Sequence, residues 1–279
     1  ADRRQRQMCI RDRYAVARCE WPPLKNALIR WVVKHFEVEL DEALVKEADG
    51  YASFNAFFTR QLEPAARPVA TGAGDIVSPV DGELSQAGQV TGGRLLQAKG
   101  RDYSLLELLG GDREMAALFA QADFATIYLS PRDYHRIHMP LDGHLRQMAH
   151  VPGRLFSVNQ QTTTTVPNLF ARNERVITLF DTPAGPMAMI LVGAIFVGGI
   201  ETVWSGVVTP RRHRVSRWEY APSAEDHLLL HRGEEMGRFN MGSTVILLFA
   251  RQRASWDPFM TPGADLRFGQ RIGGATSAV

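Results

Sequence analysis

The sequence is poor in cysteine and has no apolar run long enough to cross a membrane. Its two cysteines, Cys9 and Cys19, form neither a metal-ligand spacing nor the framework of a disulfide-rich domain. The best apolar stretch, Pro186 to Ile200, is shorter than the roughly 20 residues of a spanning helix and contains glycines, so we expect two buried strands there. Internal repeats and low-complexity tracts are also absent from the sequence. These absences favour an ordinary globular protein with a sizeable core.

The formal net charge of +2 comes from the first residues of the chain. Residues 1–13 contain five arginines and two aspartates, a net of +3, which leaves the rest of the chain at −1. This segment resembles translated sequencing-adapter DNA, so we interpret it as an artefact and exclude it from the fold prediction. The alternative is a basic arm that binds anionic lipid. Without this segment, the charge pattern gives little support to nucleic-acid binding.

The first part of the chain has helical patterns. Apolar residues recur at helical spacing from Leu24 to Phe36, while basic residues lie mostly on other faces, which predicts an amphipathic helix. Such a helix suits a membrane surface or packs on the core. Asp41 predicts the cap of a second helix that runs through Ala48, and Ser53 predicts the cap of a third over residues 54–62.

After about residue 75, short β-rich segments alternate with Gly, Pro and Asp turns. Ser104 predicts the cap of a short helix, and Asp181 to Pro186 a hairpin turn. Strands are predicted at Ala125–Leu129, Val176–Phe180, Met187–Val192, Ile200–Val208 and Val245–Ala250. The regular strand–helix alternation of a doubly wound sheet is missing. We therefore predict an α+β protein, with a helical N-terminal segment followed by a mostly β catalytic body.

Three separated motifs supply a carboxylate, a histidine and a serine, the set that activates a hydroxyl. They are Val77–Gly82 with Asp81, Tyr128–Pro140 with His135 and His138, and Arg238–Thr244 with Gly242 and Ser243. Each residue alone has an ordinary explanation. Asp81 before glycine is typical of a turn, His138 of a packed core, and Gly-Ser-Thr of a loop that enters a strand. His138 is the candidate base for Ser243, with Asp81 as the group that orients it.

His135 and His138 are three residues apart, a spacing that would place both on one face of a helix. Pro140 and the flanking Tyr and Ile favour extended chain instead, where this spacing points side chains to opposite faces. Both histidines then serve one pocket only if a turn or bulge lies between them. Because no cysteine or second acidic cluster is near, we predict no metal site.

Together, these motifs strongly resemble the phosphatidylserine decarboxylase family. The resemblance runs from about Phe57 to Ala250. Besides the three motifs, it includes Val151–Gly153, Val166–Val176, Val192–Ala194 and Ile200–Trp204. Bacterial members usually have leucine where this chain has Met241, and the similar volume predicts little effect. We divide the chain into residues 1–20 outside the family, a helical membrane-associating segment over 21–63, and a β-rich catalytic domain over 64–279.

The resemblance implies a proenzyme that cuts itself between Gly242 and Ser243 into a large chain, 1–242, and a small chain, 243–279. Ser243 would attack the carbonyl of Gly242 to form an ester, whose elimination leaves dehydroalanine and then a pyruvoyl group, the covalent cofactor. Glycine at 242 tolerates the backbone angles that this attack needs. The family's self-cleavage triad maps onto Asp81, His138 and Ser243, and His135 would belong to the decarboxylation step.

The substrate that the resemblance implies is phosphatidylserine, and the product is phosphatidylethanolamine. The substrate amine would form a Schiff base with the pyruvoyl carbonyl, which then draws electrons as carbon dioxide leaves. We expect a homo-oligomer that is peripheral on an anionic membrane surface, at the cytoplasmic face of a bacterial inner membrane. Arg211–Arg214 would meet head groups or form a solvated loop, and Thr162–Thr165 form a polar loop that could border the pocket.

Other functions stay open. A serine hydrolase built on Asp81, His138 and Ser243 predicts an intact chain, but the sequence has no Gly-x-Ser-x-Gly elbow. A non-catalytic membrane-binding β domain also predicts no cleavage, yet it needs none of these residues together. Another pyruvoyl decarboxylase, acting on a soluble amino acid, fits the chemistry but not the extent of the resemblance.

Overall fold

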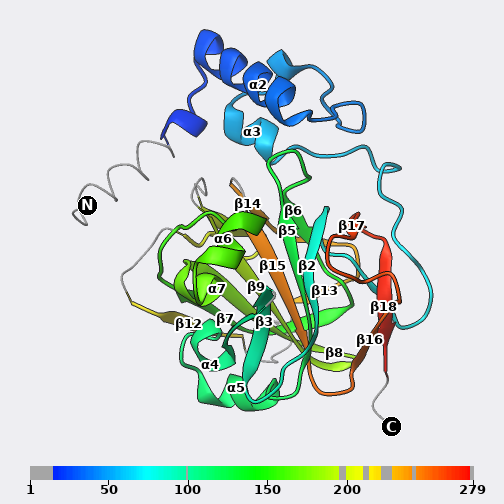
Figure 1. The fold of residues 1–279 in the computed structure, drawn as a ribbon. Coiled ribbons are helices and arrows are strands. Elements are labelled where there is room, and N and C mark those ends of the chain that lie inside the picture. Colours follow the sequence, from blue (N-terminus) through cyan, green and yellow to red (C-terminus); the bar gives the residue numbers. More distant parts are fainter. Residues whose placement is uncertain are drawn as a thin grey trace.

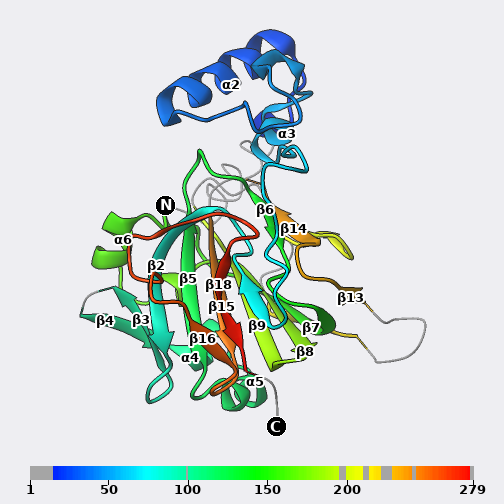
Figure 2. The ribbon, with the colours of Figure 1, turned by 90° about the vertical axis from the view of Figure 1, so that its right-hand side faces the viewer.

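The computed structural model describes residues 15–98, 100–194, 199–209, 214–220, 228–240 and 243–276. A small helical segment lies above a mostly β body (Figure 1). A view turned by 90° shows the same division, with α2 (Pro22–Phe36) and α3 (Phe54–Phe58) above the strands (Figure 2). The predicted α+β class, a helical N-terminal segment followed by a β-rich body, is confirmed.

The remaining helices are short and lie mostly in the body. They are the 3-10 turn η1 (Ala48–Gly50), α4 (Leu105–Leu108), α5 (Arg113–Leu118), α6 (Gln160–Thr165) and α7 (Leu169–Arg172). The strands are β1 (Asp75–Val77), β2 (Gly82–Gln89), β3 (Arg94–Ala98), β4 (Arg101–Ser104), β5 (Asp123–Leu129), β6 (Arg136–His138), β7 (Gly143–Val151), β8 (Arg175–Thr182), β9 (Gly185–Gly193), β10 (Ile200–Thr202), β11 (Gly206–Val207), β12 (Ser216–Glu219), β13 (Leu229–Leu230), β14 (Glu235–Phe239), β15 (Ser243–Phe249), β16 (Ala254–Trp256), β17 (Asp265–Leu266) and β18 (Arg271–Ala275).

The large sheet of the body is antiparallel and has the strand order β12-β7-β8-β9-β15-β5-β2-β17, with β13 also paired to β7. Its central strand, β15, is buried at every position. A strand that is covered on both faces needs no alternation of apolar and polar residues, which explains the run from Val245 to Phe249. β15 therefore lies in the middle of the main hydrophobic core.

A smaller sheet, β11-β10-β14-β6, carries two of the motifs toward β15. β14 pairs with β6, the strand that ends at His138, and with β10. The chain leaves β14 at Phe239 and enters β15 at Ser243. A third sheet, β1-β18-β16, packs C-terminal strands against the residues just before Asp81.

Helix α2 begins with proline and ends at Glu37, which has a left-handed backbone (φ 54°). Its buried Ile29 and Val32 pack with the phenylalanines of α3 in a core separate from that of the body. The predicted cap of α3 is confirmed, because the Ser53 hydroxyl accepts the Ala56 N–H. No helix in the described part of the chain is both long and apolar enough to span a membrane.

Three sequence predictions are wrong. The helix predicted from Asp41 does not form, because the backbone there pairs instead with the chain around Leu62 (Leu44 N–H to Gln61 O, 2.9 Å). The predicted strand Ile200–Val208 is divided into β10 and β11 by a turn, in which the Thr202 hydroxyl accepts the Ser205 N–H.

The third wrong prediction is the polar loop Thr162–Thr165, because these residues lie in helix α6. Asn159 caps this helix by accepting the Thr162 N–H at 3.0 Å. The threonine hydroxyls donate to carbonyls three or four residues earlier, which satisfies side chains that otherwise compete with a helix. The cap at Ser104 and the hairpin between β8 and β9 are confirmed.

Arg175 provides a test of the body's stability. Its guanidinium is buried and donates to the carbonyls of Leu108, Glu107 and Asn173, and burial lowers its pKa to about 10. Arg175→Met leaves buried carbonyls without donors, so we expect a loss of about 3 kcal/mol in unfolding free energy by urea titration. Arg146→Met, which removes an exposed ion pair with Asp181, should cost about 0.5 kcal/mol or less. Equal losses in the two variants would contradict this role of Arg175.

Candidate active site

The link between β14 and β15 defines the candidate site. The Phe239 N–H donates to His135 O at 3.0 Å, and the Asn240 N–H donates to Gly199 O at 2.9 Å. Only Met241 and Gly242 separate Asn240 from Ser243, so the two Cα atoms lie within about 11 Å of each other. Met241 and Gly242 lie outside the described residues. Gly242 is the residue whose carbonyl carbon Ser243 is predicted to attack.

Ser243 is the first residue of β15 and is completely buried. Its backbone lies between Leu129 of β5 and Gly193 of β9. Its hydroxyl oxygen has no hydrogen-bond partner in the described part of the chain. A buried hydroxyl without a partner is costly, and Ser243 shares this state with the neighbouring Thr244 hydroxyl and with the Asn240 side chain at the other end of the link.

The neighbour of Ser243 in β9 is itself held by a motif that the resemblance includes. The Asn173 side-chain amide donates to Gly193 O at 2.8 Å, and the Gly193 N–H donates to Glu174 O at 2.9 Å. Asn173 is fully buried and also bonds both backbone groups of Phe156. Asn173 therefore fixes one side of the Ser243 position, a role that its motif gave no specific reason to predict.

His138 is held from three directions. Its Nδ1 is 2.8 Å from Gly233 O, and because a carbonyl only accepts, Nδ1 carries the proton. Its Nε2 is therefore an acceptor, and the Tyr134 hydroxyl donates to it at 3.0 Å. The Phe268 ring stacks on the imidazole with centroids 3.7 Å apart. Burial lowers the pKa of His138 to about 4, so the imidazole is neutral at pH 7.

His135 is fully buried and precedes β6. Its Nδ1 donates to Asp133 O at 2.8 Å, whereas its Nε2 has no partner among the described residues. The Phe58 ring of α3 lies 4.1 Å from the imidazole, and burial lowers the pKa of His135 to about 3. The helical segment thus forms one wall of this site, which its sequence did not indicate.

Asp81 is also buried, but its hydrogen bonds go to other groups. Its carboxylate accepts two guanidinium donors of Arg67, the shorter at 2.7 Å, and the Phe268 N–H at 2.7 Å. No hydrogen bond joins Asp81 to His138 or His138 to Ser243. Phe268 is instead the residue that contacts both Asp81 and His138. It lies beyond the stretch of resemblance, so nothing in the sequence marked it.

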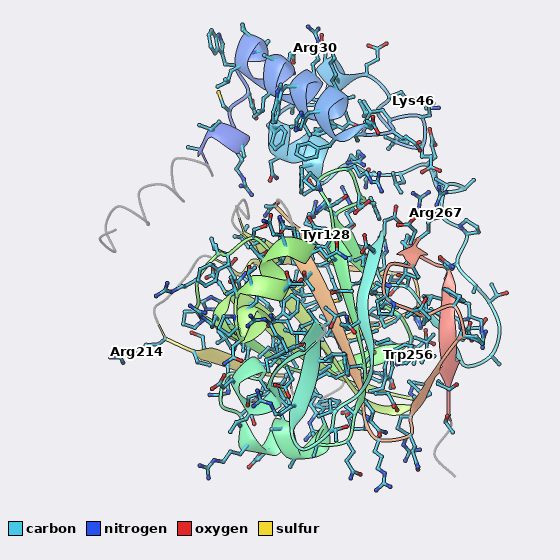
Figure 3. The ribbon with its side chains drawn as sticks, in the orientation of Figure 1. Arg30, Lys46, Tyr128, Arg214, Trp256 and Arg267 are labelled. Carbon is cyan, nitrogen blue, oxygen red and sulfur yellow. The ribbon has the colours of Figure 1, made fainter. Side chains whose placement is uncertain are left out.

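A cavity of about 350 Å³ lies where the helical segment meets the body. Asp81, Tyr134, Arg60 and Arg67 line it, together with Tyr128 and Arg267, which Figure 3 shows just below the helices. Tyr134, whose hydroxyl donates to His138, is thus part of the cavity wall, whereas His135, His138 and Ser243 are not among the lining residues.

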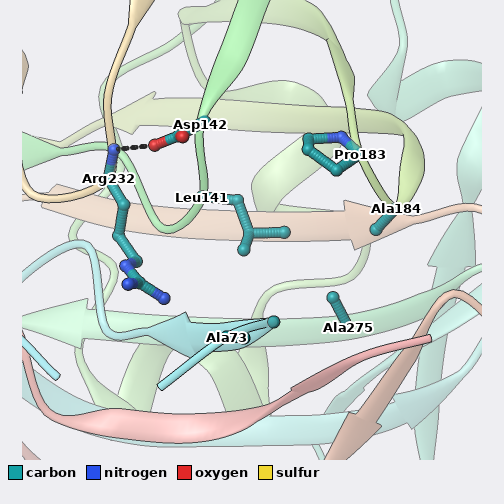
Figure 4. Close-up of a pocket in the computed structure, with 8 residues that line it drawn as sticks. Ala73, Leu141, Asp142, Pro183, Ala184, Arg232 and Ala275 are labelled. Atoms are coloured by element: carbon teal, nitrogen blue, oxygen red, sulfur yellow. Dashed lines mark hydrogen bonds between the residues drawn. The ribbon is translucent and has the colours of Figure 1, made fainter. Parts of the chain in front are cut away.

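A second cavity, of about 310 Å³, lies elsewhere in the body (Figure 4). Its walls include Leu141, Pro183, Ala184 and Arg232, and the Arg232 N–H donates to Asp142 at 2.7 Å. None of the predicted site residues lines this cavity. Across the described ranges, no group of three or more His, Cys, Asp or Glu side chains is arranged to hold a metal ion.

Comparisons with known proteins agree with the sequence motifs. A family model described as phosphatidylserine decarboxylase matches residues 54–274, and one described as PSD matches residues 14–37. A phosphatidylserine decarboxylase proenzyme of Azotobacter vinelandii is 53% identical over 94% of this chain and 91% of its own length. Proteins of the same name from Stutzerimonas stutzeri and Pseudomonas fluorescens are 52% and 51% identical, over 93% and 92% of this chain and 88% and 90% of their own lengths.

The titration of the two histidines is a direct test of this geometry. Burial lowers both pKa values, so the native state takes up fewer protons than the unfolded chain below about pH 6.5 and loses stability as the pH falls. We expect the imidazole NMR signals of His135 and His138 to stay unchanged between pH 8 and pH 5. The control is the same labelled protein in urea, where every imidazole should titrate near about 6.5. A native midpoint above about pH 6 for either histidine would contradict the described burial.

Proposed function

This chain belongs to the phosphatidylserine decarboxylase family, and on that basis we propose that it is a self-processing enzyme that converts phosphatidylserine to phosphatidylethanolamine and carbon dioxide. The observation that carries the proposal is Ser243. Its hydroxyl is buried and unpartnered at the first position of the central strand, directly after a glycine. The serine-hydrolase and binding-domain alternatives have no support from the matched family or from the relatives.

We assign the self-cleavage to Ser243, with His138 as its base. Ser243 Oγ bonds to the Gly242 carbonyl carbon as its proton passes to His138, and the peptide C–N bond breaks when the nitrogen takes up a proton. Loss of the Ser243 α-proton then expels the Gly242 carboxylate and leaves dehydroalanine. Water replaces its nitrogen, which leaves as ammonia, and the pyruvoyl group remains on the small chain, 243–279.

The protonation state of His138 supports this role. A neutral imidazole at pH 7 is ready to accept a proton, and the bond from Nδ1 to Gly233 O leaves Nε2 as the accepting nitrogen. The Tyr134 hydroxyl must release Nε2 before Ser243 can use it. Asp81 completes the proposed triad as the group that orients His138.

The pyruvoyl group would supply the electron sink on which the decarboxylation depends. His135 is the residue that we assign to this step. Its Nε2 is unpartnered and its Nδ1 is fixed by Asp133 O, so the imidazole can exchange a proton at one defined atom. Phe58 and the rest of α3 form a wall that keeps water from Nε2 of His135.

The helical segment, residues 21–63, is the proposed membrane contact. Trp21, Trp31 and Leu44 expose 63%, 56% and 52% of their surface, and Arg30 and Lys46 lie on the same segment (Figure 3). Arg30 is paired with Asp49 and Lys46 with Glu63, so the exposed tryptophans carry the proposed contact with the lipid interface. Because Glu37, Arg60 and Leu62 of this segment line the 350 Å³ cavity, docking would bring lipid head groups close to that cavity.

We propose that the protein is peripheral at the cytoplasmic face of a bacterial inner membrane, with residues 64–279 as the catalytic domain. Of the predicted basic cluster, Arg211, Arg212 and His213 lie outside the described residues, and Arg214 lies just before β12. A homo-oligomer remains a prediction from the resemblance.

Intact-mass spectrometry tests the self-cleavage. The native sequence should give two chains that divide after Gly242, the smaller beginning with a pyruvoyl group. Ser243→Ala should give one uncut chain without decarboxylase activity, because no hydroxyl is available to attack. Ser255→Ala, which alters an exposed serine of the same small chain, should cleave normally. Cleavage or activity in Ser243→Ala would refute the mechanism.

Vesicle co-sedimentation tests the membrane contact. Trp31→Ser should weaken binding to anionic phospholipid vesicles by about tenfold, because a tryptophan no longer enters the interface. Self-cleavage should be unaffected. Leu118→Ser is the control, since it removes an exposed apolar side chain from α5 at the opposite end of the body. If both variants bind vesicles as well as the native chain does, the helical segment is not the docking surface.

A further inference from the structure

The hydrogen bonds of the Asp81 carboxylate are made with groups other than His138. Arg67 approaches it with two nitrogens, and the side chains of both residues are only 10% exposed. Arg67 is held in turn by Glu42 at 2.7 Å. The remaining bond of the carboxylate is the one from the Phe268 N–H, at 2.7 Å. Asp81 is therefore a fixed anchor for the backbone at Phe268.

The side chain of Phe268 lies on the imidazole of His138. The two rings are nearly parallel, with an interplanar angle of 16° and centroids 3.7 Å apart. The Tyr134 ring is also near, 5.6 Å from the imidazole and 6.2 Å from the Phe268 ring. Phe268 thus covers one face of His138 and restricts rotation of the imidazole about the axis set by its bond to Gly233 O.

The loop that carries Phe268 is held by the motif that contains Asp81. Besides the bond from Asp81, the Gly269 N–H donates to Ser78 O at 3.0 Å, and the Ser78 N–H donates to Gln270 O at 2.8 Å. Gly269 has a positive φ of 82°, and a Cβ there would lie 2.8 Å from Pro68 O. The motif therefore fixes this loop through three bonds, and Pro68, outside the motif, makes Gly269 a position where only glycine fits.

We propose that Phe268 is a positioning residue for self-cleavage, and that Asp81 acts on His138 through Phe268 rather than through a hydrogen bond to the imidazole. The inference rests on the proposed function, because it concerns His138 as the base for Ser243. Asp81 fixes the Phe268 backbone, the Phe268 ring fixes the imidazole plane, and Nε2 keeps the direction needed for proton transfer. The ring also excludes water from the imidazole, which keeps it neutral.

The Asp81 charge itself raises the pKa of His138 through space, so any variant that removes this charge lowers the pKa by the same direct effect. The proposed arrangement adds a second effect: loss of the bond to the Phe268 N–H frees the ring, lets water reach the imidazole and raises the pKa. Asp81→Asn and Asp81→Ala both remove the charge, but only Asp81→Ala also removes the acceptor, so their comparison isolates the second effect. Glu235, Arg136 and the Tyr134 hydroxyl also influence His138, and they are unchanged in this comparison.

The first experiment measures the pKa of His138 by NMR in the full chain carrying Ser243→Ala, with His138→Gln to assign the signal. We expect Phe268→Leu, which keeps every charge, to raise this pKa by about one unit or more, and Phe268→Tyr, which keeps a stacked ring, to leave it unchanged. Asp81→Ala should give a higher pKa than Asp81→Asn, because both lose the charge and only Asp81→Ala loses the acceptor for the Phe268 N–H. Phe268→Leu should have little further effect in the Asp81→Ala background, where the ring is already free.

An unchanged pKa in Phe268→Leu, equal pKa values in Asp81→Ala and Asp81→Asn, or an undiminished effect of Phe268→Leu in the Asp81→Ala background would overturn the proposal. If Asp81→Ala does not fold, Phe268→Leu and Phe268→Tyr still decide whether the ring controls the imidazole. This measurement does not depend on cleavage, so it stands even if the native chain proves to be uncut and the proposed function fails.

The second experiment follows release of the 243–279 fragment after cell-free synthesis, over a range of pH. Phe268→Leu should slow cleavage by about tenfold at neutral pH and move the acid limb of the rate profile to higher pH, because protonated His138 cannot act as a base. Phe268→Tyr should keep both the native cleavage rate and the native position of the acid limb. A purely structural role would instead slow cleavage equally at every pH, with the acid limb in place, and that result would reject Phe268 as a positioning residue.

Discussion

The pairing of β15 between β5 and β9 is the constraint on which the site depends. Ser243 begins this strand, and its backbone is fixed on both sides by Leu129 and Gly193. A serine at the edge of a mobile loop could move to meet a base, but a serine in the middle of a sheet cannot. The remaining groups must therefore be brought toward Ser243 by the small β14–β6 sheet. It places His135 beside the end of β14 that leads into β15, whereas His138 lies opposite Glu235 at the start of β14.

Burial of these groups then determines their chemistry. His135 and His138 lie in the interior with one nitrogen of each donating to a carbonyl, so each is neutral with a defined accepting nitrogen. The cost of burying such groups is met by packing from both parts of the molecule, Phe58 from the helical segment and Phe268 from the C-terminal loop. The site is thus complete only when three distant parts of the chain are assembled.

The sequence predicted what depends on local patterns and motifs. The apolar run after Ser243 identified the central strand, and the three motifs identified Asp81, His138, His135 and Ser243 as candidates. It did not predict that Arg67 and the Phe268 N–H would donate hydrogen bonds to the Asp81 carboxylate, because neither contact follows from spacing along the chain. The helix predicted from Asp41 failed for a similar reason, since pairing with the chain at residue 62 satisfies that backbone better than an isolated turn of helix.

In the proposed two-chain enzyme, this architecture also explains why cleavage need not separate the products. The small chain contributes β15 to the centre of the main sheet, and β16 and β18 to the sheet that contains β1. Its Phe268 lies between Asp81 and His138 of the large chain. Removing the small chain would expose the main hydrophobic core to water. The free energy lost in that way would be far larger than the loss from breaking the one peptide bond that joins the two chains. In that enzyme, the bond after Gly242 could break while these strand pairings are kept.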